Sequence, residues 1–107
     1  MTTFDERERA FEAKFARDEE MAFRIVARRN RLLGYWAAEL MKLTKAEADA
    51  YATSVVHAEF EEAGDDDVVR KLIGDLTAAD IACDEALVRR AIDEHTVEAR
   101  RQLMASE

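Results

Sequence analysis

The sequence predicts an all-α protein with a single domain, and three observations indicate this fold class. The chain of 107 residues contains no Pro and only 3 Gly, so the residues that most often interrupt helices are scarce. Ala, Glu, Arg and Leu, which favour helices, are abundant. Apolar residues recur three and four positions apart, as on an amphipathic helix, and no strand pattern of useful length is present. A chain of this length accommodates one small core.

The first helical stretch is expected to begin at Thr3, because Thr3 and Glu6 have the spacing of a capping box. A continuous helix to Leu43 would far exceed the roughly 11 to 12 residues of a typical globular helix, so we expect a break near Asp18. Beyond the break, apolar residues follow the spacing of a bundle helix. They are Ile25, Leu32, Trp36, Leu40 and Leu43, with Leu33 and Ala37 widening the stripe.

Three shorter helices are expected to follow. A second capping box, Thr44 with Glu47, begins a helix that runs to about Glu62 and ends at Gly64. A third, short helix begins within the aspartates at 65–67. Residues 77–83 form a connection with one helical turn of its own, and Asp84 then caps a last helix that runs to about Met104. The apolar stripes of these last two helices are Val69, Leu72, Ile73 and Leu76, and Val88, Ile92, His95, Ala99 and Leu103.

The formal net charge of -8 is unevenly distributed along the chain. Residues 1–31 carry eight Lys and Arg against seven Asp and Glu, so the acidity belongs to the last two thirds. Three of the five phenylalanines, Phe4, Phe11 and Phe15, fall within the first 16 residues of this near-neutral N-terminal part. Ordering the backbone costs about 1 to 2 kcal/mol of conformational entropy per residue, and the segment has too little apolar area for burial to offset this cost. We therefore expect it to be frayed or disordered in the free protein and to fold on a partner.

An alternative interpretation of the same segment is structural. In it, Phe4, Phe11 and Phe15 simply extend the core stripe of the first helix, since apolar stripes usually belong to a core. The density of charged residues around the three Phe, from Asp5 to Arg17, favours the recognition helix over this alternative.

The sequence contains no pattern that supports a phosphate-binding or nucleic-acid-binding protein. Gly34, Gly64 and Gly74 stand apart, so no phosphate-binding loop is present. A basic stripe of Arg17, Arg24, Arg28 and Arg31, with Arg29 beside it, is compatible with nucleic acid, but the acidic chain and the Glu20–Arg24 spacing favour a solvated or partner-facing stripe. We predict no binding of nucleic acid.

Metal and catalytic sites are likewise not indicated. His57 and Glu61 could ligate a metal, yet no third ligand is apparent. Asp65, Asp66 and Asp67 lack the spacing of a calcium loop and are interpreted as a cap, with Asp66 and Asp67 placed four residues before Arg70 and Lys71. His95 is interpreted as a neutral residue at the bundle boundary, and Cys83 has no paired His. The prediction is a non-enzyme without cofactor or metal.

The single Cys83 allows no internal disulfide and agrees with a reducing compartment. No apolar run reaches the roughly 18 to 20 residues of a membrane span, and the charged N-terminus does not fit a signal peptide. We expect a cytoplasmic protein without direct membrane insertion.

The residues resemble a known family. Positions 1–16, Met-Thr-Thr-Phe-Asp-Glu-Arg-Glu-Arg-Ala-Phe-Glu-Ala-Lys-Phe-Ala, resemble the start of the zeta subunit, the ATPase inhibitor of alphaproteobacterial F-type ATP synthases. Positions 27–38, from Ala27 through Gly34 to Ala38, are similar to the second block of that family. The helix after Gly64 and the residues 99–102 add weaker support.

The resemblance implies a four-helix bundle, residues 19–107, with a mobile N-terminal arm, residues 1–18, that becomes helical when it enters a catalytic interface of the ATPase head. There it would block rotation in the hydrolytic direction, so the partner is the catalytic head of F-type ATP synthase and the protein is peripheral to the inner membrane. The implied partner-binding residues are Phe4, Asp5, Arg7, Glu8, Arg9, Phe11, Lys14 and Phe15.

Two other functions remain as alternatives. One is a helical adaptor or oligomerisation module whose N-terminal stripe pairs with another copy or an unrelated protein. The other is a protein that binds a small molecule. Weak binding of adenine nucleotide is left open, and the sequence contains no motif for it. The sequence leaves the inhibitory strength, regulation by pH or nucleotide, the docking face of the bundle and the oligomeric state open.

Overall fold

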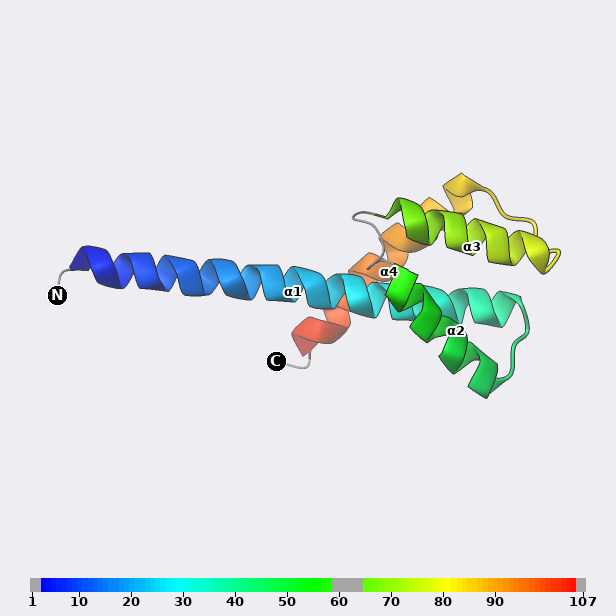
Figure 1. Cartoon of the computed structure of the whole chain (residues 1–107), viewed down its shortest axis with the longest axis horizontal. Coiled ribbons are helices and arrows are strands. Elements are labelled where there is room, and N and C mark those ends of the chain that lie inside the picture. The colour runs from blue at the N-terminus through cyan, green and yellow to red at the C-terminus, as the bar shows by residue number, and fades with distance from the viewer. Residues whose placement is uncertain (1–2, 59–64, 106–107) are drawn as a thin grey trace.

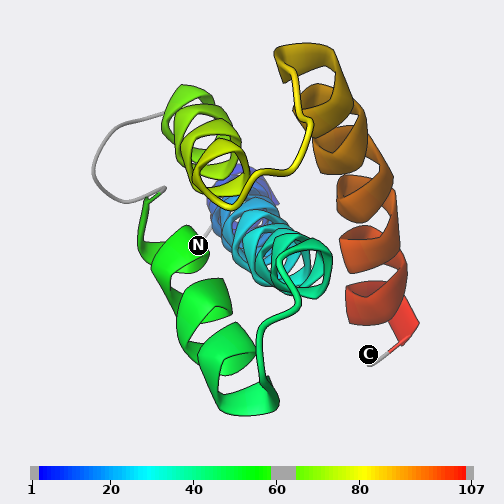
Figure 2. The same cartoon turned by 90° about the vertical axis from the view of Figure 1, so that its right-hand side faces the viewer.

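Four α-helices follow one another along the chain: α1 (Thr3–Leu40), α2 (Lys45–Ala58), α3 (Asp66–Ala78) and α4 (Glu85–Ala105). The computed structural model describes residues 3–58 and 65–105, and within residues 3–16 it describes the backbone and the side chain of Arg7. No strand occurs in these ranges, which confirms the all-α fold class. Figure 2 shows α2, α3 and α4 arranged around α1.

α1 is the longest element, with 38 residues and a length of about 57 Å at 1.5 Å per residue. It accounts for the elongated shape of the molecule, whose extents are 64 × 25 × 21 Å. The predicted break near Asp18 is wrong, because α1 continues through this position. No Pro or Gly precedes Gly34, so the local propensity of α1 favours one continuous helix.

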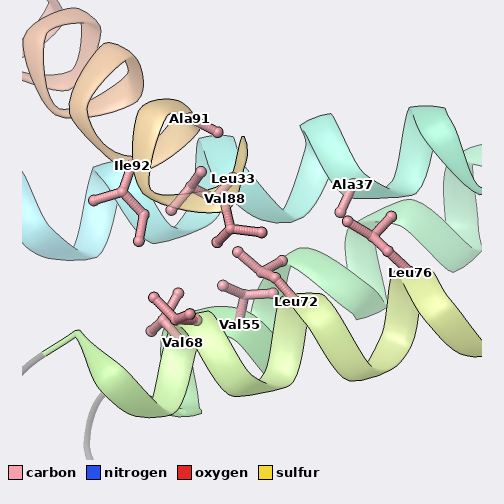
Figure 3. Packing of buried hydrophobic residues seen from close by; sticks show 10 residues of the cluster. Leu33, Ala37, Val55, Val68, Leu72, Leu76, Val88, Ala91 and Ile92 are labelled. Atoms are coloured by element: carbon pink, nitrogen blue, oxygen red, sulfur yellow. The ribbon is translucent and has the colours of Figure 1, made fainter. Parts of the chain in front are cut away.

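The hydrophobic core lies between the second half of α1 and the other three helices (Figure 3). Most of the predicted stripe residues of α3 and α4 are buried, whereas Ile73, His95 and Leu103 are half-buried. Val68 is fully buried and was not predicted. The cluster consists of Leu33, Ala37, Val55, Val68, Val69, Leu72, Leu76, Val88, Ala91 and Ile92.

The buried face of α1 differs from the predicted one. Leu40 is 39% exposed, while Ile25 and Trp36 are only half-buried. The fully or almost fully buried positions are Arg29, Asn30, Leu33, Gly34, Ala37 and Ala38. Gly34, Ala37 and Ala38 are small, which lets neighbouring helices approach this part of the face closely, and Trp36 and Leu40 lie at its margins.

The two capping predictions in the described loops are confirmed. The Thr44 amide donates to Glu47 Oε1 at 2.8 Å, and the Glu47 amide donates to Thr44 Oγ1 at 3.2 Å, which completes a capping box. The Leu87 amide donates to Asp84 Oδ1 at 2.8 Å at the start of α4. The side chains of the predicted Thr3–Glu6 cap and the predicted end of α2 near Glu62 and Gly64 lie outside the described residues.

The cap at the start of α3 differs from the prediction. Asp65 is the N-cap residue, but its side chain makes no cap hydrogen bond. Its Oδ1 instead accepts from Arg29 Nη2 at 2.9 Å. Arg29 also donates to Asn30 Oδ1, and it is only 5% exposed, so it does not belong to the solvated basic stripe. A buried guanidinium requires such partners, because the desolvation of an unpaired charge is costly.

Each pair of helices in contact is joined by at least one polar side-chain interaction. α1 is joined to α2 by the Tyr35 hydroxyl donating to Asp49 Oδ1 at 2.5 Å, and to α3 by Arg29 and Asp65. The Tyr51 hydroxyl, whose pKa is raised by burial and by the neighbouring carboxylate, donates to Asp75 Oδ2 at 2.7 Å between α2 and α3. The remaining pairs are α3 with α4, through Asp66 and Arg89 at 3.1 Å, and α1 with α4, through Arg28 and Gln102 at 3.0 Å.

Gly34 marks the closest approach of α1 and α2. A Cβ atom placed on Gly34 would lie 2.4 Å from the Cα of Ala52, which is backbone and cannot move aside alone. Both residues are buried. The absence of a side chain at Gly34 therefore sets the distance between the two helices.

We predict that Gly34→Ala destabilises the protein by about 1 to 3 kcal/mol, because the added methyl group forces α1 and α2 apart. Gly74→Ala is the matched control: it lies exposed within α3, and nothing is within 4 Å of its added Cβ. This second change is expected to stabilise by about 0.5 to 1 kcal/mol through helix propensity. Urea unfolding of both variants measures the difference, and equal effects would contradict the close approach.

Candidate functional site: the N-terminal part of α1

The N-terminal part of α1 extends beyond the other three helices. Figure 1 shows it as a single helix that continues past the ends of α2 and α4. Residues 3–18 have a length of about 24 Å at the rise of an α-helix. This segment contains all eight sequence-predicted partner-binding residues.

The structure places these eight residues on consecutive turns of one helix. The side chain of Arg7 is exposed, and the side chains of the other seven lie outside the described ones. The seven are Phe4, Asp5, Glu8, Arg9, Phe11, Lys14 and Phe15. Their positions on the helix, however, follow from the backbone alone.

The three Phe positions share one face of α1. At 3.6 residues per turn, Phe4, Phe11 and Phe15 fall within an arc of about 40°. By the same helical periodicity, the three Phe positions lie on the same side of α1 as Leu33, which belongs to its buried face. This face is covered by other helices in the bundle, but in Figure 1 no other helix runs beside its N-terminal continuation. The apolar stripe thus continues beyond the elements that cover it.

The basic stripe of α1 lies on a different face. Arg17, Arg24, Arg28 and Arg31 are all exposed, and their positions fall within about 60° of arc. Arg24 pairs with Glu20 at 3.0 Å, as the i,i+4 spacing predicted. Arg31 donates to the Tyr35 hydroxyl at 3.2 Å, and its guanidinium lies 5.5 Å from the centre of the Tyr35 ring.

A short polar network joins α1 to α4 where the N-terminal segment leaves the bundle. Arg28 Nη1 donates to Gln102 Oε1, and Gln102 Nε2 donates to Glu98 Oε1 at 3.2 Å. Arg101 donates to both carboxylate oxygens of Glu98, at 2.9 and 2.5 Å. The Arg101 guanidinium, followed by the Gln102 amide, lowers the pKa of Glu98 to about 2. Glu98 has the helical spacing of a pair with Arg101 and Gln102, whereas the contact of Gln102 with Arg28, 74 residues away, has no signal in the sequence.

The remaining candidate residues form no further site among the described residues. No group of three or more His, Cys, Asp or Glu is placed to hold a metal ion there, and Glu61, the proposed companion of His57, lies outside that range. His95 is half-buried, with its Nδ1 2.7 Å from the Ala91 carbonyl oxygen and its ring 6.1 Å from that of Trp36. Burial raises the pKa of the Cys83 thiol, which disfavours the reactive thiolate.

The two aspartates in the first turn of α3 pair differently from the prediction. Asp66 lies 3.1 Å from Arg89 of α4, and Asp67 pairs with Arg70 three residues later. Lys71 pairs with Asp75 at 3.1 Å. These carboxylates therefore form ion pairs within α3 and between α3 and α4.

We predict that Glu98→Gln makes the thermal midpoint of unfolding depend less on pH between about pH 4.5 and pH 2. A carboxyl group whose pKa falls from 4.5 to about 2 on folding stabilises the folded state above pH 4.5, and this contribution is lost as the pH falls toward 2. Thermal midpoints between these pH values measure it. Glu94→Gln, an exposed change on the same helix, is the control. Parallel acid profiles for wild type and Glu98→Gln would contradict the network.

Comparisons with known proteins match most of the chain. Among the described residues, no helix has both the length and the apolar character needed to cross a membrane. No curated protein matches the sequence. A solution NMR structure is 45% identical in sequence, with a TM-score of 0.72, over 81% of this chain and 99% of that chain. The family model of ATPase inhibitor subunit zeta matches residues 1–102, so the chain belongs to the ATPase inhibitor subunit zeta family.

Proposed function

We propose that this protein inhibits ATP hydrolysis by F-type ATP synthase by inserting its N-terminal arm, residues 1–18, into a catalytic interface of the ATPase head. The inserted arm blocks rotation in the hydrolytic direction. Residues 19–107 form the bundle that holds and orients the arm. The protein acts as a regulatory subunit without catalysis of its own, and it is cytoplasmic and reaches the inner membrane only through the ATP synthase.

The observation that carries this proposal is the uncovered continuation of the apolar stripe of α1. Phe4, Phe11 and Phe15 occupy one face of a helix that projects from the bundle. A helix that presents apolar residues at such spacing is suited to a groove in a partner. Membership of an ATPase inhibitor family supports the identity of that partner.

The physical chemistry of the segment fits reversible insertion. A solitary helix without tertiary contacts is marginal in water, so the arm is expected to exchange between helical and disordered conformations in the free protein. Binding then orders it, and this entropy cost is offset by burial of the three Phe. The charged residues Asp5, Arg7, Glu8, Arg9 and Lys14 pair with groups that line the interface and select the register.

We predict that Phe11→Ala with Phe15→Ala raises the concentration needed for half-inhibition by at least about 100-fold, because each buried Phe contributes about 1.5 to 3 kcal/mol. ATP hydrolysis by the isolated head measures the loss. Val97→Ala, at a site on α4 that is 65% exposed, is the control and should inhibit like wild type. Undiminished inhibition by the double variant would refute the role of the arm.

We also predict that deletion of residues 1–17 shifts the thermal midpoint by less than about 3 °C, since the arm contributes little to the core. Scanning calorimetry of full-length and shortened protein tests this. A large drop would show that Phe4, Phe11 and Phe15 belong to the core, as in the structural alternative.

A further inference from the structure

Residues 19–28 of α1 join the projecting arm to the part of the helix that the bundle covers (Figure 1). The residues at 29–30 are buried, those at 25–27 are half-buried and those at 22–24 are exposed. Cover by the other helices therefore ends gradually along this stretch, whereas the backbone of α1 stays helical throughout.

The helix of residues 19–28 is stabilised by contacts that do not involve the arm. Arg28 Nη1 donates to Gln102 Oε1 of α4 at 3.0 Å, which fixes the end nearest the bundle. Further out, Glu20 and Arg24 form an ion pair at 3.0 Å, in the acid-before-base order that favours a helix. Neither Gly nor Pro occurs before Gly34. The helix of the bundle is thus extended into the solvent as far as the arm.

A helix that is already formed changes the cost of ordering the arm. The first turn of an isolated helix is unfavourable by a factor of about 1000, whereas each further residue with good helix propensity is added at almost no cost. Ten of the 16 residues at 3–18 are Ala, Glu, Arg or Lys, which favour helices. The arm can therefore become helical by propagation from residue 19, without forming a first turn of its own.

We infer that residues 19–28 act as a helical seed, from which the helix propagates into the arm both in the free protein and on the ATPase head. The effect on inhibition rests on the proposed function, and it gives the bundle a part in binding, because the bundle keeps the seed helical. A seeded arm has a smaller entropy cost of ordering for binding to offset. An arm separated from the seed has to form its first turn on the partner.

The test interrupts the seed and leaves the arm and the core unchanged. Ala22 is exposed, and Ala22→Pro removes the helical hydrogen bond from its amide to the carbonyl of Asp18 and breaks α1 there. Cα chemical shifts report the helical population of residues 3–18 in the free protein. We expect this population to fall at least about 3-fold, because the arm then needs its own first turn. For the same reason, the half-inhibitory concentration for ATP hydrolysis should rise at least about 10-fold.

A milder pair of variants separates the seed from the stability of the bundle. Ala22→Gly and Ala50→Gly each place Gly at an exposed position inside a helix, the first in the seed and the second in α2. Ala22→Gly should lower the helical population of residues 3–18 and raise the half-inhibitory concentration about 2- to 5-fold. Its thermal midpoint should stay within about 2 °C of wild type. Ala50→Gly should lower the thermal midpoint by about 4 to 8 °C and leave the helical population and the inhibition unchanged.

The two measurements decide different points. Equal helical populations of residues 3–18 in wild type and Ala22→Pro overturn the seed. Wild-type inhibition by Ala22→Pro also overturns it, because the seed then contributes nothing to binding. The proposed function fails separately, if the double Phe variant of the arm still inhibits. In that case the helical population of the free protein still tests the seed.

Discussion

The close packing of the second half of α1 against all three other helices is the interaction on which the rest of the structure depends. Its buried face is built from small residues around Leu33, and Gly34 allows the backbone of α2 to approach. α1 is therefore held from several sides along residues 29–38. This fixed half of α1 sets the direction in which a helical N-terminal segment leaves the bundle.

This arrangement separates two requirements within one element. The second half of α1 must be buried to fold the bundle, while under the proposed function the first half must remain available to a partner. The ion pair of the buried Arg29 with the partly exposed Asp65, and the hydrogen bond between Arg28 and Gln102, lie near the boundary between the two halves of α1. These polar contacts fix how α3 and α4 sit on α1, and so fix what surrounds the base of the arm.

The sequence predicted the four helices, the caps at Thr44 and Asp84, and most of the apolar stripes of α3 and α4, because these features are local. It could not predict that Arg29 is buried or that Asp65 binds it, since the partners are 36 residues apart. Leu40 was predicted to belong to the core stripe but is exposed, because the spacing of apolar residues does not reveal which face of α1 the other helices cover. The eight predicted partner-binding residues came from a family resemblance, while the common helical face of Phe4, Phe11 and Phe15 follows from the backbone of α1. The open groove lined by Phe23, Val56 and Leu103 joins residues of three helices, and no pattern in the sequence predicts it.

The most direct test of the account is amide hydrogen exchange along α1, in the free protein and in its complex with the ATPase head. The account predicts that amides of residues 3–18 exchange quickly in the free protein and become protected in the complex. Amides of residues 29–38 should be protected in both states. Equal protection of residues 3–18 in both states, or fast exchange of these residues in an inhibited complex, would contradict the claim that the arm is the inserting element.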